Sequence, residues 1–326
     1  MTTQRSTSAI EVAGAAGTPG FIRRFAIVAL SVVIISAGAR VAQKQEATEF
    51  TQLAPHLLVF ATRTGNVVAS IGREGAFLVG TPSADSTPQI SRILAGRTTS
   101  PFRYVVIFPQ NTSHSEGDAG WGKMGAFVAM HENALGRIGG HAMGPPSPLP
   151  PRLRNLGVDR PRISFSEVLC VDINGEAIHV VHQSPGFSDA DALVHFHVAN
   201  LVYLGEVFPG DSYPLVDIAE GGRIDGLIKT LRPWTDKTLK VVPARGKVTN
   251  GESVEAFLTM LTTIRARVRK MIDSGQSKEQ VLAAHLTTDF DGRWGQGIVS
   301  PDAFVQEVYD SETLPTDKSA APAAKQ

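Results

Sequence analysis

Short apolar runs separated by polar turns and three longer segments of helical periodicity organise the chain between residues 57 and 273. Short alternating or fully apolar runs are typical of strands, and apolar positions three to four residues apart are typical of helices. The strands are predicted at 66–80 (an opening pair), 103–108, 163–171, 177–182, 192–198, 200–204 and 239–242. The helices are predicted at 86–94, 222–231 and 251–273, with a further helix and strand leading to His131.

Turn signals separate these elements. Asn174-Gly175 lies between two apolar runs and predicts a β-hairpin over 171–180, because both residues tolerate the positive φ that a two-residue turn requires. The proline-rich stretch 145–151 predicts an exposed loop, since each proline lacks a backbone donor. The Ala-, Pro-, Lys- and Ser-rich tail, 314–326, is predicted to be disordered.

The N-terminal 39 residues predict export. Arg23-Arg24 precede the apolar run 25–35, which is short for a membrane span but typical of a signal peptide, and small residues at 37–39 follow it. An uncleaved signal anchor reaching Ala42 is the alternative. Both interpretations place the domain of residues 40–313 outside the cytoplasm, periplasmic or secreted, or held at the membrane.

Composition narrows the function classes. With 326 residues and 42% hydrophobic content, the chain can bury the core of one α/β unit of ~250 residues plus extensions. A formal net charge of zero gives no argument for nucleic acid, and the basic cluster 265–270 is interpreted as a solvated helix face. The single cysteine, Cys170, is interpreted as a small buried hydrophobe.

Four loops that follow predicted strands carry the candidate chemistry. They read Asn-Thr-Ser-His-Ser-Glu-Gly-Asp at 111–118, Ser-Pro-Gly-Phe-Ser-Asp-Ala-Asp at 184–191, Leu-Gly-Glu at 204–206 and Pro-Ala-Arg-Gly at 243–246. Together with the opening strand pair and the Asn-Gly hairpin, their order resembles the metallo-β-lactamase superfamily. The resemblance implies an α/β (α+β) fold, a four-layer αββα sandwich with a C-terminal helical extension.

The resemblance lies in the scaffold and not in the metal site. Seven positions correspond to those where the family holds two zinc ions, and none carries the family's residue: Ser113, Ser115, Gly117, Asp118, Phe187, Glu206 and Arg245. Phenylalanine has no donor atom, a guanidinium repels a cation, and only Glu206 keeps a carboxylate. Gly80 likewise replaces an aspartate that supports the family's metal loop. No metal cofactor is therefore expected.

Histidines are the candidates for a rebuilt site. His114, Glu116 and Asp118 alternate in the former metal loop and, with Glu206, could present one imidazole and three carboxylates to a weakly held divalent ion. The competing interpretation is a set of solvated loop residues. The other histidines are interpreted as structural: His179, His182, His195 and His197 on strands, and His131 as a packing or capping residue at a helix start.

Two function classes follow. One is a non-hydrolytic binding or structural protein that takes an unknown small molecule or protein in the former active-site cleft. The other is a divergent hydrolase, β-lactamase-like or thioesterase-like, that uses zinc or another divalent metal. Under the first, a bridging carboxylate without metals needs a new partner, so Arg245 is predicted to donate hydrogen bonds to Glu206, Asp118 or both.

Overall fold

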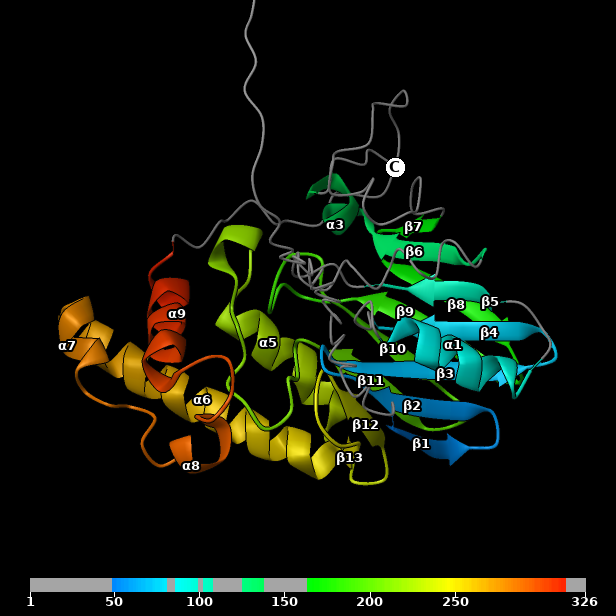
Figure 1. Ribbon diagram of the computed structural model, residues 1–326. Coiled ribbons are helices and arrows are strands. Elements are labelled where there is room, and N and C mark those ends of the chain that lie inside the picture. Colours follow the sequence, from blue (N-terminus) through cyan, green and yellow to red (C-terminus); the bar gives the residue numbers. More distant parts are fainter. Residues whose placement is uncertain (1–48, 81–85, 99–101, 108–124, 138–162, 315–326) are drawn as a thin grey trace, which may run out of the picture. The chain divides into compact units, whose positions relative to one another are not determined.

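Two β-sheets form the centre of the computed structural model (Figure 1). The structure describes residues 49–80, 86–98, 102–107, 125–137 and 163–314, all within one compact unit. In these residues the first sheet runs in the order β1 (Glu49–Ala54), β2 (Leu57–Ala61), β3 (Asn66–Gly72), β4 (Gly75–Val79), β5 (Phe102–Val106), β6 (Phe127–His131) and β7 (Ile163–Phe165). The second runs β13 (Thr249–Asn250), β12 (Lys240–Pro243), β11 (Leu201–Gly205), β10 (Ala192–Phe196), β9 (Glu176–His182) and β8 (Val168–Ile173).

Helices cover the outer face of each sheet. The described helices are α1 (Thr87–Ala95), α3 (Glu132–Arg137), α5 (Ile224–Leu231), α6 (Gly251–Asp273), α7 (Lys278–Leu282), α8 (Asp291–Trp294) and α9 (Pro301–Thr313), with the 3-10 turns η1 (Ile218–Glu220) and η2 (Arg232–Trp234). In Figure 1, α1 lies across β3 and β4, while α5 and α6 lie beside the second sheet.

Three apolar cores separate four layers. One joins the inner faces of the two sheets and includes Phe77 and Phe196, whose rings meet edge to face at 6.2 Å. The second lies between the first sheet and Ile90 and Leu94 of α1. The third lies between the second sheet and helices α5, α6 and α9, where Phe257 is fully buried. Each sheet is covered by helices on its outer face and by the other sheet on its inner face, which is the αββα architecture that the family resemblance implied.

Local signals place several elements where the pattern predicts them. Asn174 and Gly175 both have positive φ, +56° and +77°, as a two-residue hairpin turn requires. The observed α6 has the predicted bounds, and the side chain of Asn250 caps its first turn by accepting from the backbone N–H of Ser253 at 3.3 Å.

Two predictions need correction. The single strand expected at 163–171 is two strands, because the chain crosses from the first sheet to the second at the exposed polar pair Ser166-Glu167. Cys170 is exposed, not buried, because it faces outward on β8, an edge strand of the second sheet. Because β8 is an edge strand and helices cover only part of its sheet, an outward-facing side chain on it is left in solvent.

Several sequence predictions lie outside the described residues. They concern the N-terminal segment 1–39, the former metal loop at 111–118, the proline-rich loop and the tail beyond Leu314. Within the part of the chain that the structure describes, no helix combines the length and apolarity needed to cross a membrane.

Candidate functional site

Strand register brings the candidate loops of the second sheet to one edge. β9 and β10 are antiparallel, with His182 opposite Ala192, so the loop 183–191 lies at that end of the pair. β10 and β11 are antiparallel and β11 and β12 are parallel, so the residues that follow Gly205 and Pro243 reach the same edge. This arrangement gathers Phe187, Glu206 and Arg245, as the sequence predicted for these three residues.

Arg245 and Glu206 form a two-point ion pair. Nη1 of Arg245 donates to Oε2 of Glu206 and Nη2 donates to Oε1, both at 2.9 Å. The side chains are 29% and 18% exposed, so the pair is partly buried. Both carboxylate oxygens accept from a single guanidinium, which is the strongest geometry available to these groups. The predicted bond from Arg245 to Glu206 is therefore confirmed, while Asp118 lies outside the described residues.

Asn66 of β3 fixes the loop that carries Arg245. Its buried side-chain amide donates to the carbonyls of Pro243 and Gly246, each at 2.9 Å, and its backbone N–H donates to Ala244 O at 2.7 Å. Three bonds from one residue of the first sheet therefore hold the end of β12 in the second. The sequence analysis did not identify Asn66, because the partners are some 180 residues away and asparagine opening a strand is not unusual.

Gly80 and Tyr203 lie beside the ion pair. Gly80 has φ of +101°, and a Cβ built there would lie 2.5 Å from Asn66 O and 3.3 Å from the Tyr203 hydroxyl. Any side chain at this position, including the aspartate of the family's pattern, would therefore collide with the backbone. Burial raises the pKa of Tyr203, as does the Glu206 carboxylate, while Arg245 lowers it. The phenol consequently stays protonated at neutral pH.

A buried carboxylate shapes the loop that bears Phe187. Oδ2 of Asp191 accepts the backbone N–H groups of Gly186 and Phe187 at 2.9 and 2.7 Å, and Oδ1 accepts the Ser188 N–H and hydroxyl at 2.9 and 3.1 Å. Burial raises the pKa of Asp191 to about 7, against the lowering effect of these donors. Phe187 itself is 3% exposed and presents an apolar ring where the family would place an imidazole.

Two stacked histidines lie next to this loop. The rings of His131 and His182 are 3.9 Å apart and nearly parallel. Nδ1 of His131 accepts the Asn133 N–H at 3.2 Å, so its Nε2 carries the proton and donates to Ser166 O at 2.9 Å. This contact confirms the capping role predicted for His131, although the residue ends β6 and α3 begins one residue later. Burial lowers the pKa of both rings.

The remaining histidines predicted on strands gather on the outer face of the second sheet. His179 lies on β9 and His195 on β10, whereas His197 lies in the turn that follows β10 and not on the strand as predicted. The rings of His195 and His197 are 4.0 Å apart, and His197 Nε2 lies 3.0 Å from His179 Nδ1. Burial, together with the two neighbouring imidazoles, lowers the pKa of His195 to about 4. Trp234 meets His195 edge to face at 5.2 Å, which fits the structural role predicted for these side chains.

The described former metal positions do not fit a metal. Phe187 offers no donor atom, Arg245 carries a fixed positive charge, and both oxygens of Glu206 are engaged by that guanidinium. Throughout the described ranges, no three histidine, cysteine or acidic side chains are arranged to hold an ion. Ser113, His114, Ser115, Glu116, Gly117 and Asp118 lie in a range that the structure does not describe.

Comparison with solved structures identifies the fold. An inverting sec-alkylsulfatase from a Pseudomonas species superposes with a TM-score of 0.61 at 13% identity, covering 81% of this chain and 50% of that one. This chain therefore spans half the alkylsulfatase's length. The metallo-β-lactamase IND-7 gives 0.54 at 14% identity, and the metallo-β-lactamase from Pontibacter korlensis gives 0.52 at 14%; they cover 67% and 66% of this chain and 99% of their own.

Sequence comparison adds no closer relative. No protein-family model matches the chain, and no curated protein sequence matches it significantly. At 12–15% identity the structural likeness carries the architecture alone. The two facing sheets, their helical layers and these superpositions show that this chain has the metallo-β-lactamase fold.

Proposed function

We propose that this chain is a non-hydrolytic protein, a pseudoenzyme on the metallo-β-lactamase fold, whose former metal cleft holds an ion pair. The observation that carries the proposal is the two-point contact between Arg245 and Glu206. In this account the guanidinium supplies the positive charge that metal ions supply in the family. The cleft then serves as a binding surface for a small molecule or a protein, or as a structural element.

The chemistry of the neighbouring groups supports the proposal. A general base must take a proton from its substrate, and a carboxylate already paired with a guanidinium at both oxygens is poorly placed to do so. Glu206 gives both oxygens to Arg245, and Tyr203 is held in its protonated form. The hydroxyl of Ser188 donates to Asp191 and accepts from Ala190, so that side chain is engaged as well. These groups fit a stable closed surface better than a hydrolytic centre.

Metal content and hydrolysis test the proposal together. The full chain, purified in the presence of zinc, should contain far less than one zinc per molecule, and chelator should leave its melting temperature unchanged, since metal held by a folded site adds to folding stability. It should not hydrolyse a chromogenic cephalosporin, a thioester or a secondary alkyl sulfate. Stoichiometric zinc whose removal abolishes hydrolysis of any of these would overturn the proposal.

A reverted variant tests whether the three described positions are former metal positions. Phe187→His/Glu206→Asp/Arg245→His restores three donor side chains of the family's pattern. We expect this triple variant to bind zinc measurably tighter than the parent in equilibrium dialysis. The matched control is the same set with Phe187→Leu in place of Phe187→His, which removes one donor and should lose most of the gain. Equal zinc binding by both variants would show that Phe187 does not correspond to a metal position.

A divergent hydrolase is the second candidate, and its residues are His114, Glu116 and Asp118 with Glu206. Its signature is hydrolysis that chelator abolishes and that His114→Ala removes. Export is also proposed, from the sequence of residues 1–39. Fusing residues 1–45 to a reporter enzyme that is active only outside the cytoplasm tests it, and N-terminal sequencing of the exported full chain separates a cleaved signal peptide from an anchor.

A further inference from the structure

A basic hollow lies on the helical side of the molecule. It has a volume of about 370 Å³ and opens to solvent between α5, α6 and α9. Arg232, Arg265, Arg269 and Glu312 line it, and Ile228, Thr262 and Ala266 supply its less polar surface. None of these residues belongs to the strands and loops that carry Glu206 and Arg245.

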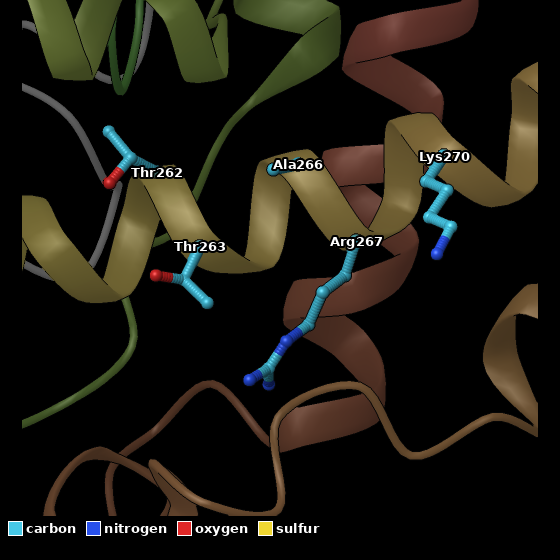
Figure 2. A pocket seen from close by; sticks show the side chains of 5 residues that line it. All are labelled: Thr262, Thr263, Ala266, Arg267 and Lys270. Carbon is cyan, nitrogen blue, oxygen red and sulfur yellow. The ribbon is translucent and has the colours of Figure 1, made fainter.

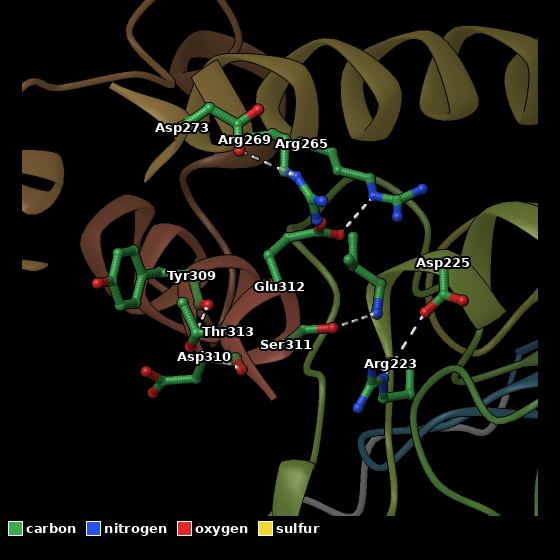
Figure 3. Close-up of polar contacts among 11 residues, drawn as sticks. Arg223, Asp225, Arg265, Arg269, Asp273, Tyr309, Asp310, Ser311, Glu312 and Thr313 are labelled. Carbon is green, nitrogen blue, oxygen red and sulfur yellow. Dashed lines mark hydrogen bonds and ion pairs between the residues drawn. The ribbon is translucent and has the colours of Figure 1, made fainter. Parts of the chain in front are cut away.

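Glu312 holds two of the arginines in place. Its side chain is 4% exposed and accepts from Arg265 Nε at 2.5 Å and from Arg269 Nη1 at 2.6 Å, as Figure 3 shows. Each carboxylate oxygen therefore binds a different guanidinium. Because α9 positions the carboxylate and α6 positions both arginines, the two cations are held side by side before any ligand arrives. Such pre-organisation lowers the cost of binding.

The arginines keep free donors. Arg265 uses only Nε for Glu312, so its two terminal nitrogens have no partner among the described residues. Arg269 uses Nη1 for Glu312, and its Nε lies 3.6 Å from Asp273, an exposed residue outside the hollow. Arg232 is exposed and makes no side-chain hydrogen bond within the described ranges. A guanidinium that is already oriented and still has free N–H groups matches the oxygens of an oxyanion.

Charge and shape point to one ligand class. Among the residues that line the hollow, three guanidinium groups against the Glu312 carboxylate leave two excess positive charges. Asp273 pairs with Arg269 from outside the hollow, and because both side chains are exposed, solvent screens that pair. A phosphate monoester carries about −1.5 to −2 at pH 7 and would balance that charge, whereas a single carboxylate would not. The volume exceeds that of one ion, and Ile228 and Ala266 offer apolar surface to an organic group. We propose that this hollow binds a small organic phosphate through Arg232, Arg265 and Arg269.

A neighbouring face of α6, which shares Thr262 and Ala266 with the first hollow, offers a contrast. There a second hollow of about 420 Å³ is lined by Thr262, Thr263, Ala266, Arg267 and Lys270 (Figure 2). Its arginine is already committed, because Arg267 donates to both oxygens of Asp289 at 2.6 and 2.8 Å and to Leu286 O. That hollow therefore lacks a second oriented guanidinium with free donors.

The proposal is tested by titrating the protein with phenyl phosphate at constant ionic strength. Binding is measured from amide chemical shifts and by calorimetry. We expect saturable binding with a Kd of about 1 mM or lower and shifts centred on residues 262–269. Arg232→Gln should weaken binding about tenfold, because this exposed side chain contributes to the hollow without a structural partner. Lys270→Gln, which removes one positive charge from the same helix outside the hollow, should leave the Kd unchanged.

Titrations with two further ligands test which class of anion the hollow prefers. Inorganic phosphate should bind more weakly than phenyl phosphate because it lacks the apolar part, and phenyl sulfate should bind several-fold more weakly because it carries one charge. Equal affinity for phenyl phosphate and inorganic phosphate would overturn the assignment to an organic phosphate, and equal affinity for phenyl sulfate would overturn the charge argument. Absence of saturation, or equal weakening by Arg232→Gln and Lys270→Gln, would overturn the site itself.

Discussion

Glu206 and Glu312 are both held by arginines, but the two arrangements leave different chemistry behind. Glu206 gives both oxygens to one guanidinium, which uses its two terminal nitrogens. Glu312 divides its oxygens between two guanidinium groups, and each of those keeps N–H donors free. The first arrangement neutralises a site and closes it. The second neutralises only half of the positive charge and presents the rest, so the number of arginines per carboxylate separates a structural pair from a candidate binding surface.

Removing Arg245, which binds both oxygens of Glu206, should have the largest effect. Arg245→Ala leaves a mostly buried carboxylate without a counter-charge and should lower the free energy of unfolding by about 2–3 kcal/mol, below the value for a fully buried pair because both side chains reach solvent. Chemical denaturation measures the change. Arg245→Ala/Glu206→Gln should recover part of the loss. An Arg245→Ala variant as stable as the parent would remove the basis for treating the pair as the replacement of the metals.

Removing one of two partners should cost less. Arg265→Ala leaves Glu312 paired with Arg269, so we expect a loss of about 1 kcal/mol in the free energy of unfolding. The same denaturation experiment on both arginine variants tests the comparison directly. If Arg265→Ala lowered the free energy of unfolding as much as Arg245→Ala, then Arg269 alone would not compensate the charge of Glu312. The proposed difference between Glu206 and Glu312 would then be wrong.

Lowering the pH should destabilise the loop 183–191 more than the α6–α9 region, with a smaller effect than the substitutions above. The folded-state pKa values of His131 and His182 lie below the ordinary value of 6.5, so the neutral rings contribute stability that is present above pH 6.5 and is lost as the pH falls toward the folded-state values. Hydrogen exchange between pH 7 and pH 5 should show falling protection in the loop 183–191. Protection in α6 and α9, which arginines join to Glu312, should change less.

A matched variant assigns that effect. His182→Gln retains a side-chain donor for the carbonyl of Asp189 but cannot take up a proton, so the loop in this variant should lose less protection on acidification. An unchanged pH dependence in His182→Gln would show that other groups at this edge, such as Asp191, govern it. Asp191 acts with the opposite sign, because its raised pKa favours the folded state at lower pH.

The sequence predicted local features better than long-range ones. The Asn174-Gly175 turn and α6 follow from short patterns, and both were confirmed. The split of the predicted 163–171 strand was missed because Ser166 and Glu167 interrupt an otherwise strand-like run without a glycine or proline to mark the change of sheet.

For the site, family resemblance supplied what spacing could not. It aligned Glu206 with Arg245 across 39 residues, and their pairing follows once the ends of β11 and β12 are known to lie at the same edge. The roles of Asn66 and Glu312 depend on contacts between elements far apart in sequence, for which no local pattern exists. Phosphate binding by Arg232, Arg265 and Arg269 likewise requires three elements to be placed before it can be considered.

The side chain of Asn66 also constrains the order in which this protein can be assembled. It bonds to a carbonyl 177 positions later in the chain, so the edge that holds Arg245 cannot be completed until synthesis has passed Gly246. Contacts of such sequence separation form late and slow the folding of the domains that depend on them. Until then the early strands are without their final partner. We expect this stage of biosynthesis to be the one at which a chaperone has most to protect.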